Sequence, residues 1–484
     1  MTHPRDEHLF VIFGGTGDLA KRKLLPALAR RMIAGDLPAG CVVLGISRRK
    51  WTDAEYRTFV RETLHTAGIV SESIIRQLEQ RVYYHSIGQG LREDFYRLGQ
   101  RMHELETAHR LKGNRVLYLA LPPDAVHTTI NRIGEAELHR SSGWTRVVIE
   151  KPFGRDLASA RQLNQTLHQW FDESQIFRID HYLGKETVQN LIAFRFANAV
   201  FESLWNRDRI DFITITVAED IGIAHCAGYF DRVGTLRDMV QNHLMQLLTL
   251  IAMEVPIAFT ARDLRYEKVK VLQAIAPITP ERVVYGQYTA GNVHGRSVPA
   301  YRDEPGIPAD SNTETFVAAR LEIANWRWQG VPFYIRTGKR LPRRVTQIVV
   351  HFRCPPVSIF QPSVHCKIRP NILVMNLQPD EGFALGFQVK RPGPGFQLDT
   401  VRFEYRYADT FGPLPDAYET LLLDVIEGDP TLFVSEAEVE RAWALWAPLL
   451  EQSVPVYPYP AGTWGPAEAD RILVQDHIWV NINT

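Results

Sequence analysis

Short apolar runs rich in β-branched residues alternate with helix-like stretches through the first third of the chain. The runs predict five strands, at residues 9–13, 41–46, 115–121, 145–150 and 176–180. Between the first two runs, Leu24, Leu28 and Met32 form an apolar stripe with helical spacing. Thr52 and Glu55 form a capping box that predicts a helix after the second strand. Strands that alternate with helices are typical of a doubly wound parallel sheet.

The pattern changes after residue 180. A helical stretch continues towards residue 206, residues 211–220 alternate like a strand, and a strongly helical stretch begins near Thr235. Extended runs then follow one another with little helix between them, at residues 315–323, 333–337, 346–352, 372–378 and 383–390. This pattern predicts an antiparallel sheet, with late helices at residues 416–428 and 435–451 packed against it.

Together these patterns predict a fold of the α/β plus α+β class. A Rossmann-type doubly wound parallel sheet domain is expected over residues 1–179, followed over residues 180–484 by a larger domain with an antiparallel sheet and flanking helices. Residues 291–313 are expected to form a long exposed loop inside the second domain.

The charge balance excludes two broad classes of partner. The 484 residues carry 55 Lys and Arg against 55 Asp and Glu, a net charge of zero, whereas binders of nucleic acid or acidic membranes need surplus positive charge. The four cysteines, at positions 41, 226, 354 and 366, are too scattered for a disulfide framework or a Cys-based metal site. With no signal-peptide pattern and no apolar stretch of spanning length, a soluble cytoplasmic protein without a metal is expected.

The first chemical motif is the glycine turn after the opening strand. Gly15, Gly17 and Ala20 fit the pattern G-x-G-x-x-A between a predicted strand and a predicted helix, which is the context of a dinucleotide-binding turn. Glycines there let backbone N–H groups approach a pyrophosphate at the helix N-terminus. Any tight connection between a strand and a helix could use such glycines, but the context favours the nucleotide.

A basic turn at the end of the second strand indicates which nucleotide binds. Where NAD-binding folds place an acidic residue, this chain has Ser47, Arg48, Arg49 and Lys50. Arginines suit a 2′-phosphate that a carboxylate would repel, so NADP is favoured, with NAD also accepted as an open alternative. A solvated basic turn is the other interpretation.

Two further motifs follow predicted strands of the parallel sheet. Lys151 lies just past the fourth of these runs, where such sheets bind ligands, and Pro152 is a candidate cis bond or hinge. The next run leads into four groups of complementary chemistry, namely Asp180, His181, Tyr182 and Lys185. The last three suit an anionic substrate group, leaving Asp180 to orient a base, although a polar helix start capped by Asp180 would look similar.

His243 lies on an apolar helical stripe that starts at Leu236. A histidine in that setting is more often a core residue than a catalyst, but a carboxylate such as Asp180 could tune its pKa for base catalysis. Asp238 precedes it by five positions and is therefore expected on a different part of the helix surface, suited to a substrate hydroxyl.

Six segments together resemble the glucose-6-phosphate dehydrogenases in order and spacing. They are GGTGDLAKRK, EKPFG, RIDHYLGKE, DMVQNHLMQ, RYEKVKVL and PFYIRTGKRL, and the third is the most specific to that family. The resemblance implies oxidation of D-glucose 6-phosphate to 6-phospho-D-glucono-1,5-lactone with hydride transfer to NADP, the first step of the oxidative pentose phosphate pathway. It also implies a homodimer or a dimer of dimers, and an NADP-binding first domain followed by a substrate-binding and dimerisation domain.

The resemblance also assigns roles to the residues that match. It implies His243 as the general base with Asp180 as its orienting carboxylate, and Lys151 between substrate and coenzyme. The other implied substrate contacts are His181, Tyr182, Lys185, Glu219, Asp238, Lys339 and Arg344, and the implied coenzyme contacts are Gly14, Gly15, Thr16, Gly17, Asp18, Leu19, Lys23 and Arg48. Arg344 stands where the family usually has a lysine, and an arginine fork is not equivalent to an ammonium.

Two rival functions remain open at this point. Other Rossmann-type sugar oxidoreductases also place Glu-Lys-Pro after this strand, but an unphosphorylated sugar would not need the group around Lys185. A catalytically idle NADP-binding regulator would be expected to lack the base or its partner, and both His243 and Asp180 are present.

Overall fold

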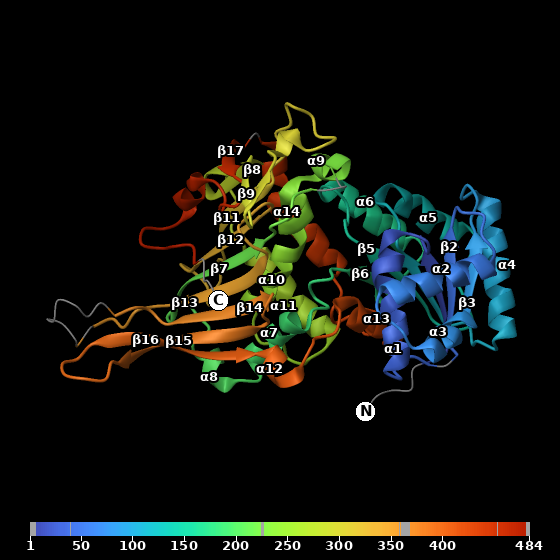
Figure 1. Cartoon of the computed structure of the whole chain (residues 1–484), viewed down its shortest axis with the longest axis horizontal. Coiled ribbons are helices and arrows are strands. Elements are labelled where there is room, and N and C mark those ends of the chain that lie inside the picture. Colours follow the sequence, from blue (N-terminus) through green and yellow to red (C-terminus); the bar gives the residue numbers. More distant parts are fainter. Residues whose placement is uncertain are drawn as a thin grey trace. The chain divides into compact units, whose positions relative to one another are not determined.

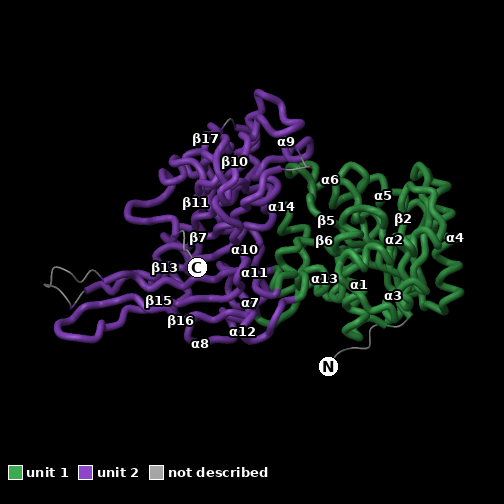
Figure 2. Tube along the Cα trace, in the orientation of Figure 1, with its two compact units in different colours: residues 1–185, 257–265, 415–440 green, residues 186–256, 266–414, 441–484 purple. Residues whose placement is uncertain are grey.

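The computed structural model describes residues 6–38, 40–223, 227–357, 359, 368–452 and 454–480 (Figure 1). Contacts divide the chain into two compact units that interleave along the sequence (Figure 2). Unit 1 comprises residues 1–185, 257–265 and 415–440, and unit 2 comprises residues 186–256, 266–414 and 441–484. The division into functional domains after residue 179 stays a prediction. Cys226 and Cys366 lie outside the described residues.

Unit 1 is built on a six-stranded parallel sheet with the order β3-β2-β1-β4-β5-β6. The strands are β1 (Leu9–Phe13), β2 (Val42–Ser47), β3 (Val82–Ser86), β4 (Arg115–Leu119), β5 (Thr145–Glu150) and β6 (Ile176–Ile179). The central strands β1, β2 and β4 are almost fully buried, as expected for a parallel sheet covered on both faces. The predicted doubly wound sheet is confirmed, and β3 is the strand that the sequence analysis did not predict.

Helices connect these strands in two groups (Figure 1). α1, α2 and α3 contact one another, whereas α4 contacts α5 and α5 contacts α6. Their bounds are α1 (Leu25–Ile33), α2 (Asp53–Thr66), α3 (Glu72–Glu79), α4 (Arg92–Ala108), α5 (Pro123–Glu135) and α6 (Leu157–His168). The Thr52 hydroxyl accepts the Glu55 N–H at 3.3 Å and the Glu55 carboxylate accepts the Thr52 N–H at 2.7 Å, so the predicted capping box is confirmed.

The late helix α13 (Ala417–Glu427) corrects one prediction, because it belongs to unit 1 and does not pack on the antiparallel sheet. Its buried residues, including Leu421 and Val425, join the core that contains α1 and β1. The pairing of the Glu419 carboxylate with the guanidinium groups of Arg30 and Arg31, at 3.5 and 2.5 Å, also ties α13 to α1.

Unit 2 is built on a nine-stranded sheet with the order β16-β15-β14-β13-β7-β12-β11-β8-β17. Most neighbours are antiparallel, as predicted, and two pairs, β7 with β12 and β8 with β17, are parallel. The strands are β7 (Ile210–Ala218), β8 (Val283–Thr289), β11 (Phe316–Glu322), β12 (Pro332–Gly338), β13 (Val345–Phe352), β14 (Ile372–Gln378), β15 (Gly382–Lys390), β16 (Leu398–Arg406) and β17 (Val456–Pro460).

Helices in unit 2 include a long buried one made of two segments. It starts with the π-helical segment η4 (Leu236–Leu244) and continues as α10 (Met245–Ala252), whose residues are all buried. The others are α7 (Glu186–Phe196), α8 (Ala199–Glu202), α9 (Ala227–Thr235) and α12 (Tyr407–Phe411), while α11 (Ala261–Ala274) and α14 (Glu436–Glu451) each run from unit 1 into unit 2.

The segment at residues 291–313 is more ordered than the predicted exposed loop. It forms a hairpin of β9 (Gly291–Val293) and β10 (Arg296–Val298), followed by a short 3₁₀ helix. Tyr301 on that helix is fully buried, and its hydroxyl donates to Asp231 at 2.9 Å. This segment is therefore tied to the core of unit 2 by an aromatic anchor. None of the helices in the described ranges is both long and apolar enough for a membrane crossing.

Candidate functional site

The glycine turn after β1 is shaped by close backbone approaches. Gly14 has a φ of +86°, and its N–H donates to the Ile46 carbonyl at 2.9 Å. A Cβ atom on Gly14 would lie 2.2 Å from the Ala120 oxygen, and one on Gly15 would lie 2.8 Å from the Gly45 Cα atom. Side chains are thus excluded at these two positions, where the backbone passes close to the neighbouring strands.

A cavity of about 610 Å³ lies at the carboxyl ends of β1, β2 and β4 in unit 1. Four predicted coenzyme residues line it, namely Gly14, Thr16, Gly17 and Arg48. Arg49 lines it as well, and so do residues that the sequence analysis did not single out, including Gln89, Phe95, Leu121, Pro122, Asp124 and Arg132. The volume lies in the range of ligand sites, and together with the glycine cradle it fits a dinucleotide.

Besides Lys151, four other predicted coenzyme residues do not line this cavity. Gly15 packs against β2, and Leu19 packs against the unit 1 core. Asp18 is exposed and pairs with Arg22 at 3.3 Å, while the Lys23 ammonium pairs with Asp416 at 2.6 Å. These residues build the start of the helix after the turn, and their direct contact with a coenzyme stays a prediction.

Lys151 follows β5, and the Lys151–Pro152 peptide bond is cis, which confirms the predicted candidate. The preceding residue, Glu150, accepts hydrogen bonds from the hydroxyls of Tyr118 at 2.6 Å and Tyr418 at 3.1 Å. Burial raises the pKa of Glu150 to about 7, although both tyrosines and Lys151 lower it. Glu150 was not among the predicted site residues, although it belongs to the same motif as Lys151.

Four predicted groups are neighbours after β6 in unit 1. The Asp180 side chain is buried and accepts the Tyr182 N–H at 3.0 Å, which fixes the carboxylate within the turn. The rings of His181 and Tyr182 have centroids 5.0 Å apart, and the Lys185 ammonium lies 3.8 Å from the centre of the Tyr182 ring. An imidazole, a phenol and an ammonium therefore gather in one short segment, as an anion site requires.

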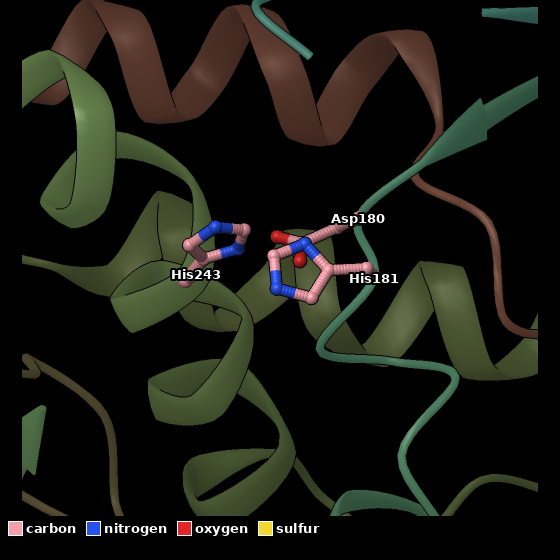
Figure 3. Close-up of side chains that lie close together, drawn as sticks. All are labelled: Asp180, His181 and His243. Atoms are coloured by element: carbon pink, nitrogen blue, oxygen red, sulfur yellow. The ribbon is translucent and has the colours of Figure 1, made fainter. Parts of the chain in front are cut away.

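His243 lies on η4 in unit 2 and is 1% exposed. Figure 3 draws it on its helix, and Asp180 and His181 on the segment that follows β6. In a π-helix, main-chain hydrogen bonds join residues five positions apart. Asp238 and His243 therefore lie closer together around the helix axis than they would in an α-helix. Their predicted placement on different parts of the helix surface assumed an α-helix.

Glu314 supports the start of η4 and was missed by the sequence analysis. Its carboxylate accepts the Leu236 N–H at 3.0 Å, and its backbone oxygen accepts the Thr235 N–H at 3.1 Å. Burial raises the pKa of Glu314. A residue 78 positions away along the chain thus satisfies backbone donors at the N-terminus of the helix that carries His243.

Two predicted sugar contacts meet at the ends of neighbouring parallel strands. Glu219 follows β7 and Lys339 follows β12, and their carboxylate and ammonium groups are 2.6 Å apart. The Lys339 backbone oxygen accepts the buried Tyr459 hydroxyl at 2.7 Å. Arg344, the residue that departs from the family pattern, is exposed in the turn before β13.

Among the described residues of unit 1, one group has the residue types of a metal site. Ligand atoms of His168, Glu173 and Glu436 lie within 4.8 Å of one another. Both oxygens of Glu173, however, accept from the guanidinium of Arg178 at 2.7 and 2.9 Å. An ion-pair network accounts for this geometry without a metal.

A parallel sheet in this strand order, with a glycine turn and a cavity of dinucleotide size at its carboxyl edge, is typical of a dinucleotide-binding domain. Comparison with known families narrows this class. Residues 11–190 match the family described as glucose-6-phosphate dehydrogenase, NAD binding domain, and residues 192–480 match its C-terminal domain. The chain belongs to the glucose-6-phosphate dehydrogenase family and is an oxidoreductase.

Similarity to individual relatives extends over nearly the whole chain. The chain is 44% identical to the glucose-6-phosphate 1-dehydrogenase of Aggregatibacter actinomycetemcomitans, covering 97% of this chain and 96% of the relative. It is 40% identical to that of Bacillus subtilis, with 99% and 100% covered. A solved glucose-6-phosphate dehydrogenase in complex with its substrate glucose-6-phosphate superposes with a TM-score of 0.90 at 35% identity, covering 98% of each chain. The Mycobacterium avium enzyme gives 0.87 at 35% identity, with each chain fully covered.

Proposed function

We propose that this protein oxidises D-glucose 6-phosphate to 6-phospho-D-glucono-1,5-lactone with NADP as the hydride acceptor, the first step of the oxidative pentose phosphate pathway. The observation that carries the proposal is the group of His181, Tyr182 and Lys185, which brings an imidazole, a phenol and an ammonium together in a chain that belongs to this family. A sugar phosphate needs such a group and an unphosphorylated sugar does not.

The chemical step needs a base for the C1 hydroxyl, and His243 takes that role. Its ring is buried on η4, and an imidazole can accept the hydroxyl proton as hydride leaves C1. Asp180 stabilises the resulting imidazolium, as a buried carboxylate does in other histidine-based catalysis. A bound nicotinamide supplies the hydride acceptor.

The remaining substrate residues divide by chemistry. His181, Tyr182 and Lys185 bind the phosphate, whose charge they match. Glu219 and Asp238 accept hydrogen bonds from sugar hydroxyls, and Lys151, Lys339 and Arg344 supply positive charge on the substrate side. The ion pair of Lys339 with Glu219 holds both groups in place before the sugar arrives.

On the coenzyme side, Gly14, Gly15, Thr16, Gly17, Asp18, Leu19 and Lys23 form or support the turn for the pyrophosphate. Arg48 and Arg49 line the cavity in unit 1 and carry the charge that a 2′-phosphate needs, which favours NADP while NAD is also accepted. Lys151 contacts both coenzyme and substrate.

The protein functions as a homodimer or a dimer of dimers through one face of β15 and β16. Cross-strand pairing puts Phe387 opposite Val401 and Leu385 opposite Phe403, so one face of this hairpin is apolar. Phe403 is 67% exposed and Val401 39% exposed, and an exposed apolar face of this kind suits a second copy of the chain. The location is the cytoplasm, which is supported by free thiols at Cys41 and Cys354.

Replacing His243 by Asn tests the function. We expect kcat for NADP reduction to fall by more than about 10²-fold, because the base is lost while the shape is similar. Binding of glucose 6-phosphate should stay close to wild type, and H103N on the exposed side of α4 serves as a control for histidine loss. The absorbance assay compares glucose 6-phosphate, glucose and galactose 6-phosphate. Near-wild-type turnover in H243N contradicts the assigned base, and equal rates with glucose contradict the phosphate group.

A further inference from the structure

The basic turn at the end of β2 is held by a side chain from the next strand. Tyr84 is the third residue of β3, 5% exposed, and pairs with Gly45 of β2 in the parallel sheet. Its hydroxyl lies 2.7 Å from the Ser47 hydroxyl oxygen and donates to the Arg49 carbonyl at 2.7 Å. The Arg49 N–H in turn donates to the Ser47 hydroxyl oxygen at 3.2 Å.

These three hydrogen bonds form a ring that joins the Tyr84 hydroxyl, the Ser47 hydroxyl and the Arg49 backbone, and each hydrogen in it is donated to one acceptor. Because the Tyr84 hydroxyl donates its hydrogen to the Arg49 carbonyl, it accepts from the Ser47 hydroxyl. The Ser47 oxygen is then free to accept the Arg49 N–H. The turn between Ser47 and Arg49 is therefore fixed at both its ends by one buried phenol.

Packing holds the phenol and the turn in the same place. The Tyr84 ring lies 5.2 Å from Tyr56 and 6.0 Å from Trp51, centre to centre, and the Tyr84 N–H donates to the Asp53 carboxylate at 2.8 Å. The Arg49 guanidinium stacks 4.8 Å from the centre of the Trp51 ring. One arginine of the basic turn is thus oriented by an aromatic group that Tyr84 itself supports.

We propose that Tyr84 is a positioning residue for coenzyme specificity, which holds the turn carrying Arg48 and Arg49 in the geometry that receives the 2′-phosphate of NADP. The inference deepens the proposed function and rests on it. Ser47, Arg48 and Arg49 line the cavity in unit 1, and Tyr84 does not, so it acts through the turn. NAD has no 2′-phosphate and gains nothing from the ordered arginines. Loss of the phenol hydroxyl should therefore weaken NADP and leave NAD unchanged.

The test uses the full chain and the variant Y84F, which keeps the aromatic ring and removes the hydroxyl. Binding of 2′,5′-ADP, which carries the 2′-phosphate, is compared with binding of 5′-ADP by titration calorimetry. We expect the dissociation constant for 2′,5′-ADP to rise about fivefold, the factor for one net hydrogen bond, with that for 5′-ADP unchanged. In steady-state assays, KM for NADP should rise while kcat and KM for NAD stay the same.

Y83F is the matched control, since Tyr83 is the adjacent residue on β3 and its hydroxyl lies 2.8 Å from His109 Nε2, away from the turn. It should leave both affinities unchanged. In a second background, R48A/R49A, adding Y84F should have no further effect on 2′,5′-ADP, because the groups it positions are gone.

Three outcomes overturn the proposal: an unchanged ratio of the two affinities in Y84F, an equal loss of both, or an undiminished effect in the R48A/R49A background. The ratio is independent of the fraction of folded protein, so partial unfolding of Y84F does not obscure the result. Failure of the proposed function shows separately in the wild type, as absence of NADP reduction with glucose 6-phosphate or as equal affinity for the two nucleotides.

Discussion

Glu150 is the last residue of β5, directly before Lys151, and its protonation makes the stability of unit 1 depend on pH. Burial raises the pKa of its carboxyl to about 7, against hydrogen bonds from Tyr118 and Tyr418 and the charge of Lys151, and Asp180 raises it further. Replacing Glu150 by Gln keeps the shape of the side chain and removes the titration. The variant therefore isolates the free-energy change that accompanies ionisation of this one carboxyl.

The size of the pH effect on stability follows from the pKa of Glu150 in the unfolded and in the folded state. The unfolded carboxyl titrates near 4.5 and the folded one at about 7, so the folded state holds the proton over that interval. Stability contributed by this group is complete below pH 4.5 and is lost as the pH rises through 7. The difference between these two pKa values corresponds to about 3 kcal/mol of stability. This is an upper value, because Glu150 is only half-buried and solvent screens its charge.

The two compact units need not unfold together, so the readout is amide hydrogen exchange of β4 and β5 at pH 5 and pH 8. We expect the free energy of unfolding of E150Q minus that of wild type to be larger at pH 8 than at pH 5, by up to about 3 kcal/mol, because only the wild type loses stability over this range. E62Q, at an exposed position on α2, should show the same difference at both pH values. A difference for E150Q that does not change with pH would refute this account.

Two further predictions concern acid stability and assembly. His8 is fully buried, with Nδ1 2.9 Å from the Asp6 carbonyl and Nε2 3.3 Å from the Cys41 sulfur, and burial lowers its pKa to about 4. As the pH falls, the unfolded state takes up the proton on His8 first, so the free energy of unfolding falls by up to about 3 kcal/mol between pH 6.5 and 4. Hydrogen exchange of β1 should show this loss in the wild type and not in H8Q. In analytical ultracentrifugation, F403D should shift the sedimenting species from dimers towards single chains. T400D, on the opposite face of β16, should not. A wild type that sediments as one chain contradicts the proposed dimer.

The strands of the parallel sheet could be predicted from the sequence because their central members are buried on both faces and read as apolar runs. β3 could not, since it alternates buried Val82 and Tyr84 with half-buried Tyr83 and His85. Such a strand lacks the apolar runs of β1, β2 and β4, and so carries a weaker signal.

The assignment of α13 to the wrong sheet has a different cause. Its apolar stripe predicts a buried face and does not say which surface covers that face. The partners that decide the matter are far away in the sequence, since Glu419 pairs with Arg31 over 388 positions. Periodicity is a local property of the chain, and it carries no information about a contact of that range.

The candidate site shows the same division between local and distant information. Motifs indicated the groups whose chemistry suits the ligands, such as Arg48 and Lys185, because ligand chemistry restricts the residue type directly. The groups that hold them in place are restricted only by geometry: the Tyr84 phenol reaches Arg49 across 35 positions, and that of Tyr418 reaches Glu150 across 268. A buried tyrosine in the sequence is indistinguishable from an ordinary core residue until its hydroxyl is seen to meet a carbonyl or a carboxylate. Variation at such supporting positions should therefore change coenzyme preference or pH response in relatives whose motif residues are identical, which makes them the positions to compare first.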